Sequence, residues 1–160
     1  MRPATRWRGS VGQTVKLKLS SRITYVDLVH QMTEDLARRA HFPKPAALDL
    51  ALAVREAFIN AVKHGNAMDE GKSVEVEFER NASRFLVAIR DEGNGFDPSQ
   101  TADPRTNENL ERTSGRGIFF MKSFVDEVSF QRRRGRGMEV MLVKHLAPAG
   151  RSTEEPGRNQ

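Results

Sequence analysis

The amino-acid sequence predicts an α+β fold, a two-layer α/β sandwich in which helices cover one face of a mixed, mostly antiparallel sheet. Two long segments with helical periodicity lie in the first half of the 160-residue chain. Shorter segments in which apolar and polar residues alternate then follow in pairs, as the strands of antiparallel hairpins do. Helices and strands that are grouped in this way pack as two layers around one core.

The first half of the folded region is expected to hold one strand and two helices. Residues 15–19 alternate apolar side chains with lysines, which is typical of a half-buried strand. Two serines follow, and they can cap a helix over about residues 22–40. Pro45 can open a second helix, which continues to about His64 and ends at Gly65.

The second half is expected to contain a hairpin, a long loop and a short helix. Residues 74–79 and 85–90 alternate with a period of two and form the hairpin. Residues 91–117 have no helix or strand periodicity, and this run exceeds the ~12 to 15 residues of a plain connection. Such a loop is usually functional or disordered. A short helix should follow over residues 117–124.

A final hairpin should place four arginines in a turn. Its strands are expected at residues 125–130 and 138–144, around the turn 132–137. The net charge of +5 is concentrated here and at residues 2–8. We expect the arginines of the turn to be solvated, where they favour solubility or contact with an acidic partner. A basic stripe with interleaved aromatic residues would favour nucleic-acid binding, but the chain has only 1 Trp and 1 Tyr.

The composition excludes several classes of protein. There is no cysteine, so a disulfide scaffold, a thiol nucleophile and a cysteine-rich zinc site are excluded, and a cytoplasmic location fits. No stretch approaches 18 apolar residues, so we expect neither secretion nor membrane insertion. We expect a flexible basic arm over residues 1–12, one domain over 13–146 and a disordered tail over 147–160.

The second helix carries the first candidate site. Glu56, Asn60, Lys63 and His64 follow one another at i, i+4, i+7 and i+8 on one stripe of a helix that is otherwise mostly apolar. A carboxylate and a carboxamide one turn apart suit Mg²⁺ or an activated water, and Lys63 suits a phosphate. The stripe is also what any amphipathic helix presents to water, and His64 could merely cap the end of the helix.

Two glycine-containing segments follow. Asp91 comes directly after a predicted strand, and Gly93 and Gly95 would let the backbone approach a flat ligand closely. Gly115, Arg116 and Gly117 open the short helix, where free N–H groups and the positive helix end can face an anion. Taken alone, each segment is weak evidence for a ligand site, because an ordinary turn or helix start has the same pattern.

Together, in this order and at these separations, the three motifs resemble those of the histidine-kinase-like (GHKL) ATPase superfamily. Within it, the small size of the chain and the sequence Gly95-Phe96-Asp97-Pro98 resemble the anti-sigma-factor serine/threonine protein kinases. The resemblance implies the Bergerat-type ATP-binding fold, with ATP or ADP and Mg²⁺ as ligands, and a lid over residues 98–114.

The resemblance also implies a role for each matching residue. Asn60 would ligate Mg²⁺, Glu56 would be the general base, and Asp91 would accept a hydrogen bond from the adenine amino group. The other residues that it places beside the nucleotide are Lys63, His64, Gly93, Gly95, Gly115, Arg116 and Gly117. One departure concerns the last strand, where family members often have threonines and this chain has Met138 and Met141.

The function implied is that of an ATP-dependent serine/threonine kinase and anti-sigma factor. Such a protein phosphorylates an antagonist, or anti-anti-sigma, protein and sequesters a sigma factor, and the resemblance also implies a homodimer. The alternative is a nucleotide-gated protein-binding switch with the same fold but without kinase activity. We expect no membrane partner and no direct contact with nucleic acid.

Overall fold

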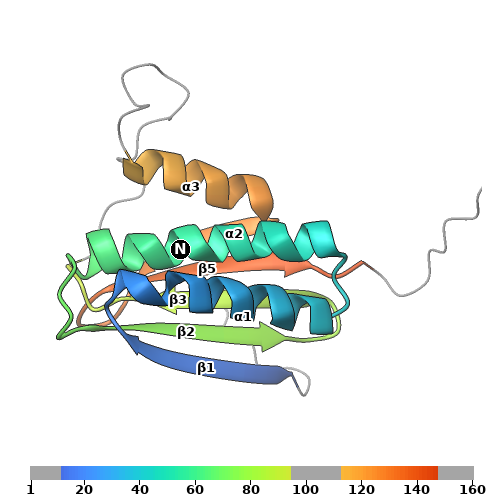
Figure 1. Cartoon of the computed structure of the whole chain (residues 1–160), viewed down its shortest axis with the longest axis horizontal. Helices are drawn as coiled ribbons and strands as arrows, with labels where there is room; N and C mark the ends of the chain where they lie inside the picture. The colour runs from blue at the N-terminus through green and yellow to red at the C-terminus, as the bar shows by residue number, and fades with distance from the viewer. Residues whose placement is uncertain (1–11, 95–112, 148–160) are drawn as a thin grey trace, which may run out of the picture.

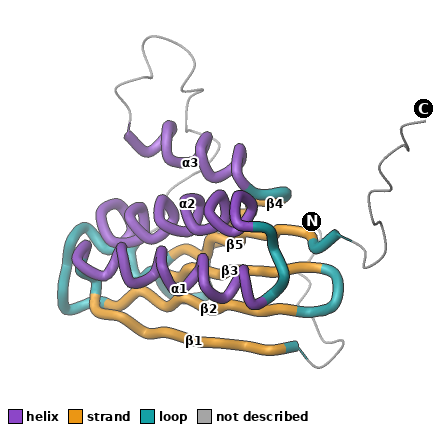
Figure 2. The backbone as a smooth tube through the Cα atoms, turned by 45° about the vertical axis from the view of Figure 1, so that its right-hand side comes forward, coloured by secondary structure: helices purple, strands orange, loops and turns teal. Residues whose placement is uncertain are grey.

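The computed structural model, which describes residues 12–94 and 113–147, contains a five-stranded sheet with helices on one side of it (Figures 1 and 2). The strands are β1 (Gln13–Ser20), β2 (Ser73–Arg80), β3 (Arg84–Arg90), β4 (Glu127–Arg132) and β5 (Met138–His145). Their order in the sheet is β1-β2-β3-β5-β4, and all four neighbouring pairs are antiparallel. The α+β sandwich that the sequence predicts is therefore confirmed.

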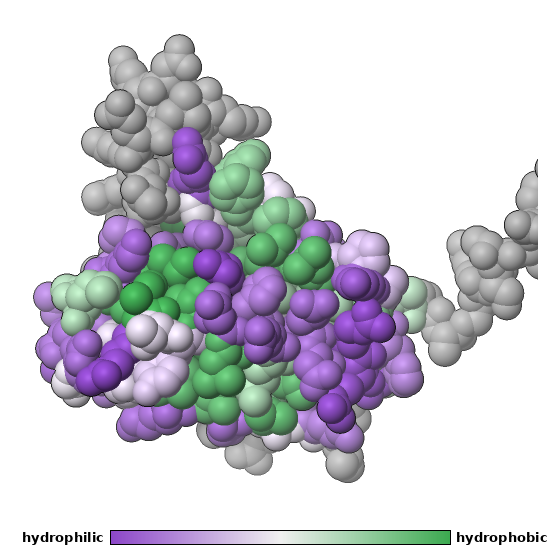
Figure 3. Space-filling view, viewed as in Figure 1, coloured by the Kyte–Doolittle hydropathy of each residue, from purple (hydrophilic) through white to green (hydrophobic). Residues whose placement is uncertain are grey.

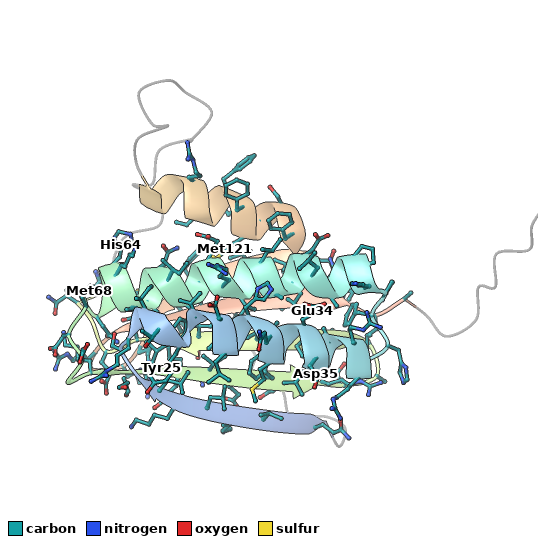
Figure 4. The ribbon with its side chains drawn as sticks, viewed as in Figure 1. Tyr25, Glu34, Asp35, His64, Met68 and Met121 are labelled. Atoms are coloured by element: carbon teal, nitrogen blue, oxygen red, sulfur yellow. The ribbon has the colours of Figure 1, made fainter. Side chains whose placement is uncertain are left out.

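The helices form the second layer. They are α1 (Val26–Arg39), which follows a short 3₁₀ turn (Ile23–Tyr25), α2 (Lys44–Asn60), which continues as a π-helical turn (Ala61–Gly65), and α3 (Thr113–Phe124). The apolar composition of α2 follows from its position, because it packs against both α1 and α3 and also contacts β3 and β5. Met121 of α3 is completely buried and points toward α2 (Figure 4).

The core lies between α2 and the inner face of the sheet. Leu50, Val54 and Phe58 of α2 are fully buried, and so are Val74 and Val76 of β2. Burying one such side chain contributes about 1.5 to 3 kcal/mol to the free energy of unfolding. The apolar residues of β2, Val74, Val76 and Phe78, are all buried, as the period-two pattern that predicts this strand requires, and Glu77 between them is buried as well.

Large apolar side chains also lie on the surface. Figure 3 shows apolar residues gathered among polar ones on the face that carries α1. The exposed large apolar residues within the described part are Leu28, Leu48, Met68, Phe119 and Phe120. No helix in the described ranges is long and apolar enough to cross a membrane.

The structure differs from the sequence prediction mainly at α3. This helix begins at Thr113 rather than at Gly117, so Thr113 and Ser114 belong to the helix and not to a lid. β4 begins at Glu127, two residues after the predicted start of that strand. The rest of the predicted lid, the basic arm up to residue 11 and the tail from residue 148 lie outside the described residues.

Candidate functional site

Three segments that are distant in the sequence meet at one end of the molecule. They are the end of α2, the end of β3 and the first turns of α3, which lie at the left of Figure 1. The meeting follows from the topology, because β3 runs toward the end of the sheet at which α2 ends, and α3 packs along α2. All three candidate motifs of the sequence lie on these segments.

Asp91 is buried directly beyond β3, with only 5% of its surface exposed. Its Oδ1 atom accepts hydrogen bonds from the main-chain N–H groups of Gly93, at 2.9 Å, and of Met138, at 3.1 Å. Its own N–H donates to the carbonyl oxygen of Met138 at 3.0 Å. One carboxylate oxygen is thus fixed by two donors, which sets the direction of the second oxygen, Oδ2.

Gly65 and Gly93 allow the first two motifs to approach each other closely. A Cβ atom on Gly65 would lie 2.3 Å from Asp91 Oδ2, and one on Gly93 would lie 1.7 Å from the carbonyl oxygen of Gly65. Neither position can therefore hold a larger residue unless the backbone moves. The sequence suggests that Gly93 permits the approach of a ligand, and the structure adds a direct backbone contact between the motifs.

Glu56 and Asn60 face the third motif across the α2–α3 contact. A Cβ atom on Gly117 would lie 3.2 Å from Glu56 Oε2 and 3.3 Å from Asn60 Nδ2. Gly117 therefore lies close to both polar side chains, each of which is half-buried. Since α3 starts at Thr113, the N–H of Gly117 lies beyond the helix's first four N–H groups, which are those without an intrahelical partner. The sequence predicts that the N–H of Gly117 is a free donor; in the structure, Gly117 instead lets α3 pack closely against α2.

The remaining predicted residues lie around this meeting point. Lys63 and His64 are exposed in the π-helical turn, and Figure 4 shows His64 at the end of α2 that is near the start of α3. Arg116 is exposed on the first turns of α3, and Gly115 lies in the same turns. Gly95 lies outside the described residues.

Asn66 is a residue of this site that the sequence analysis missed. It is completely buried, and its Oδ1 atom accepts the N–H of Glu92 at 2.8 Å. Its Nδ2 atom donates to Ser21 Oγ at 3.2 Å and to the Ser73 carbonyl oxygen at 2.9 Å. A polar residue directly after the glycine that ends an apolar helix was the available signal.

Glu92 adds a second link between the loop and the sheet. Its Oε2 atom accepts the N–H of Ser73 at 2.7 Å. This backbone hydrogen bond is the main reason why the pKa of Glu92 lies below its ordinary value, and the positive charges of Lys18 and Arg133 lower it further. The segment that begins at Asp91 is therefore fixed to the end of β2 by a carboxylate that is ionised at neutral pH.

The two methionines of the last strand lie in different places. Met138 is buried, and its main chain holds Asp91 through both hydrogen bonds given above. Met141 is half-buried and pairs with Ala88 and Ser129, one strand to either side. Only Met138 therefore contacts the site.

The arginine-rich turn between β4 and β5 is only partly solvated, which corrects the sequence expectation. Arg134 and Arg136 are exposed, but Arg133 is half-buried and donates to the carbonyl oxygen of Asp91 at 2.8 Å. Arg132 donates to the carbonyl oxygen of Asn94 at 3.4 Å. The turn is folded against the loop after β3, and the guanidinium groups of Arg132 and Arg133 have partners within the chain.

Comparison with known proteins agrees with this geometry. Residues 19–144 match the family described as the histidine kinase-like ATPase domain. The chain is 29% identical to the serine-protein kinase RsbW of Bacillus subtilis over 144 residues, which cover 82% of this chain and 85% of that protein. It is 30% identical to the serine-protein kinase RsbW of Listeria innocua, with 82% of this chain and 87% of that protein covered. The match includes α1, α2, α3, strands β2 to β4, nearly all of β5 and the three motifs that meet at the end of the sheet, and the chain belongs to the histidine kinase-like ATPase family.

Proposed function

We propose that the chain is an ATP-dependent serine/threonine protein kinase that acts as an anti-sigma factor. It transfers the γ-phosphoryl group of ATP to a hydroxyl of an antagonist protein, and it binds a sigma factor. The observation that carries the proposal is the meeting of Glu56 and Asn60 with Gly117 at the end of the sheet where Asp91 is buried. The similarity to serine-protein kinases favours transfer over a switch without kinase activity.

Asp91 recognises the base in this proposal. Its Oδ1 atom already accepts two N–H groups, and Oδ2 is the oxygen that accepts the adenine amino group. A pocket that presents one fixed acceptor discriminates against a base without a donor at that position, because the buried carboxylate would lose its partner. Gly93 and Gly95 bring the backbone against the base.

Glu56 acts on the acceptor hydroxyl. It accepts the hydroxyl proton while the oxygen bonds to the γ-phosphorus, and the bond from that phosphorus to the β–γ bridging oxygen breaks so that ADP is released. Lys63 and His64 lie in the π-helical turn that ends α2, and Arg116 lies in the first turns of α3, so these exposed side chains can approach the phosphates. The first turns of α3 add the positive end of a helix.

Asn60 is the residue that would hold Mg²⁺. Its half-buried carboxamide supplies an oxygen, the ligand atom that Mg²⁺ prefers. Mg²⁺ usually takes one or two protein oxygens and completes its shell with phosphate oxygens and waters. Among the described residues there is no group of three or more His, Asp or Glu side chains that could hold a metal ion. When bound, Mg²⁺ supplies charge neutralisation on the phosphates.

Two substitutions in α2 test the catalytic assignment. Glu56→Gln should retain affinity for Mg-ATP and lose most transfer of labelled γ-phosphate to the partner protein, because only the base is removed. Asn60→Ala should also lose the Mg²⁺ dependence of nucleotide binding, because it removes a metal ligand. Asp49→Asn, two turns earlier in α2, is the matched control and should transfer at the wild-type rate.

A wild-type transfer rate in Glu56→Gln would contradict the general-base role. ATP binding in the wild type without any transfer to an antagonist would instead support the nucleotide-gated switch. The partners are identified by the proteins that co-purify with the chain in Mg-ADP and in Mg-ATP. The cytoplasmic location and the homodimer are part of the same proposal, and sedimentation of the purified chain tests the homodimer.

A further inference from the structure

The arginine-rich turn between β4 and β5 contacts the main chain of Asp91, whose Oδ2 atom is the proposed acceptor for adenine. Arg133 Nη1 donates to the Asp91 carbonyl oxygen at 2.8 Å, across a sequence separation of 42 residues. The side chain of Arg133 is 29% exposed, although it belongs to a hairpin turn. The turn itself is closed independently by the hydrogen bond from Arg133 N–H to the Gly137 carbonyl oxygen, at 3.0 Å.

The turn contacts the loop through the backbone of Gly137 and through arginine side chains. A Cβ atom on Gly137 would lie 1.9 Å from the Asp91 carbonyl oxygen, so the two backbones are in close contact there. Beside this contact lies a pocket of about 150 Å³, which Arg132, Arg133 and Arg136 line together with Gly93 and Asn94. Among the described residues, no apolar side chain lines this pocket. The hydrogen bond from Arg133 is the shorter of the two side-chain hydrogen bonds that the turn makes to the loop, since the one from Arg132 is 3.4 Å long.

The position of Arg133 also matters for charge. Its Nη2 atom lies 3.9 Å from Glu75 Oε2, and its charge contributes to the lowered pKa of Glu92. Arg133 is thus a positive group shared by Glu75 of β2 and Glu92 of the loop. Removing the guanidinium would leave these two negative charges with less compensation, which favours a shift of the loop.

We propose that Arg133 is a positioning residue for adenine recognition, an inference that rests on the proposed role of Asp91. The peptide plane after Asp91 is held at both ends, by Arg133 at the Asp91 carbonyl oxygen and by Asn66 at the N–H of Glu92. Met138 holds the N–H and Oδ1 of Asp91, and the next peptide carries the Gly93 N–H, which also donates to Oδ1. Arg133 therefore holds the main chain from which the Asp91 side chain extends, and the hydrogen bonds to Oδ1 then set the direction of Oδ2.

The test compares Arg133→Gln with Arg134→Gln in the full chain. Arg134 is exposed in the same turn and forms no hydrogen bond or ion pair with another described residue, so it is a matched control for charge. Affinities for Mg-ATP and Mg-GTP are measured by calorimetry, because guanine presents a carbonyl oxygen where adenine presents an amino group. Thermal unfolding of each variant gives its stability separately.

Arg133→Gln should weaken ATP binding about tenfold, as expected for one charge-assisted hydrogen bond, and leave the weaker GTP binding unchanged. The ratio of ATP to GTP affinity should therefore fall, whereas Arg134→Gln keeps the wild-type ratio. Equal weakening for both nucleotides, or none, would overturn the inference. A wild type without preference for ATP would refute the adenine role of Asp91, and the inference would fall with it.

Arg133→Lys covers the case in which Arg133→Gln does not fold. One amine cannot reach the Asp91 carbonyl oxygen and Glu75 together, so the lysine should lose part of the ATP affinity, about threefold, with GTP unchanged. Full wild-type affinity for ATP in this variant would also count against the role of Arg133.

Discussion

Asn66 connects three parts of the chain through one buried side chain. Its amide oxygen holds the N–H of Glu92, and its amide nitrogen holds the oxygens of Ser21 and Ser73. Its own N–H donates to the Ala61 carbonyl oxygen at 2.8 Å, which fixes it to the π-helical turn. Since Asp91 immediately precedes Glu92, the hydrogen bond from Glu92 to Asn66 also fixes the main chain next to the proposed nucleotide site.

Asn66→Ala should lower the free energy of unfolding by at least about 2 kcal/mol, because each buried group left without a partner costs about 1 to 3 kcal/mol. Chemical denaturation measures this loss. Asn81→Ala is the control: Asn81 also accepts hydrogen bonds, from Ser83 and Arg84, but it is only half-buried in the β2–β3 turn, where water can replace it. An equal loss of unfolding free energy in the two variants would show that the burial of Asn66 does not add to its contribution to stability.

The contrast between Asp91 and Asn66 shows what sequence can predict at this scale. Asp91 follows a clearly alternating strand, so its place at a strand end follows from local pattern alone. The partners of Asn66 are 45, 7 and 26 residues away, and its burial depends on three elements meeting. No local pattern contains that information.

At the scale of elements, ion pairs join four strands on the face of the sheet away from the helices. Lys16 of β1 lies 3.1 Å from Glu77 of β2, and Arg90 of β3 lies 2.7 Å from Glu77. Arg90 also pairs with Glu139 of β5. Burial raises the pKa of Glu77, but the hydrogen bonds from Arg90 and Lys16 outweigh burial and lower the pKa below its ordinary value of 4.5.

The sign of the pH dependence follows from this lowered pKa. As the pH falls, Glu77 takes up a proton near pH 4.5 in the unfolded chain and only at a lower pH in the folded chain. The stabilisation by the charged Glu77 is therefore fully present above pH 4.5 and is lost as the pH falls through the folded pKa. Glu77→Gln should therefore be less stable than the wild type at pH 7, and the difference should shrink toward pH 3. Denaturant unfolding at several pH values measures it.

Glu79→Gln is the matched control, with the opposite sign. Burial and the neighbouring Glu77 raise the pKa of Glu79, so its charge destabilises the fold above that pKa and the effect disappears as the pH falls. Glu79→Gln should be at least as stable as the wild type at pH 7. A Glu77→Gln deficit that stays constant from pH 7 to pH 3 would contradict the assignment.

The elements differ in how well the sequence predicts them. The β2–β3 and β4–β5 hairpins were predicted because alternation and turn residues lie within a few positions of each other. The sequence places the start of α3 four residues too late, because glycines such as Gly115 and Gly117 usually occur at the ends of helices rather than within them. Gly117 lies within α3, and its lack of a side chain lets this helix pack closely against Glu56 and Asn60 of α2.

At the scale of the whole molecule, the sheet order places the site. The pairing of β3 with β5 brings Met138 beside Asp91, although the two residues are 47 positions apart. Neither this pairing nor that of β1 with β2 follows from local patterns. The resemblance to a known family supplied the arrangement of the three motifs, and the contacts of Arg133 and Asn66 emerged only from the folded structure.

Nucleotide binding should be visible in the stability of the whole domain. A ligand that binds only the folded chain adds RT ln(1 + [L]/Kd) to the free energy of unfolding, about 2.7 kcal/mol at 100 times the Kd. Mg-ATP should therefore raise the melting temperature of the wild type, and Asp91→Asn should lose most of that rise, because the amide can present a donor to the adenine amino group.

Asp69→Asn controls for the loss of a carboxylate in a turn. Asp69 Oδ1 accepts the N–H of Gly71 at 2.9 Å, just as Asp91 Oδ1 accepts the N–H of Gly93 at 2.9 Å, but Asp69 is exposed and forms no part of the proposed site. Both variants lose one negative charge in an Asp-x-Gly turn, so nonspecific effects of charge on Mg-ATP binding are matched. Mg-ATP should raise the melting temperature of Asp69→Asn by as much as it raises that of the wild type. An equal rise in Asp91→Asn would show that the nucleotide binds without this carboxylate, and adenine recognition would have to be assigned to another residue.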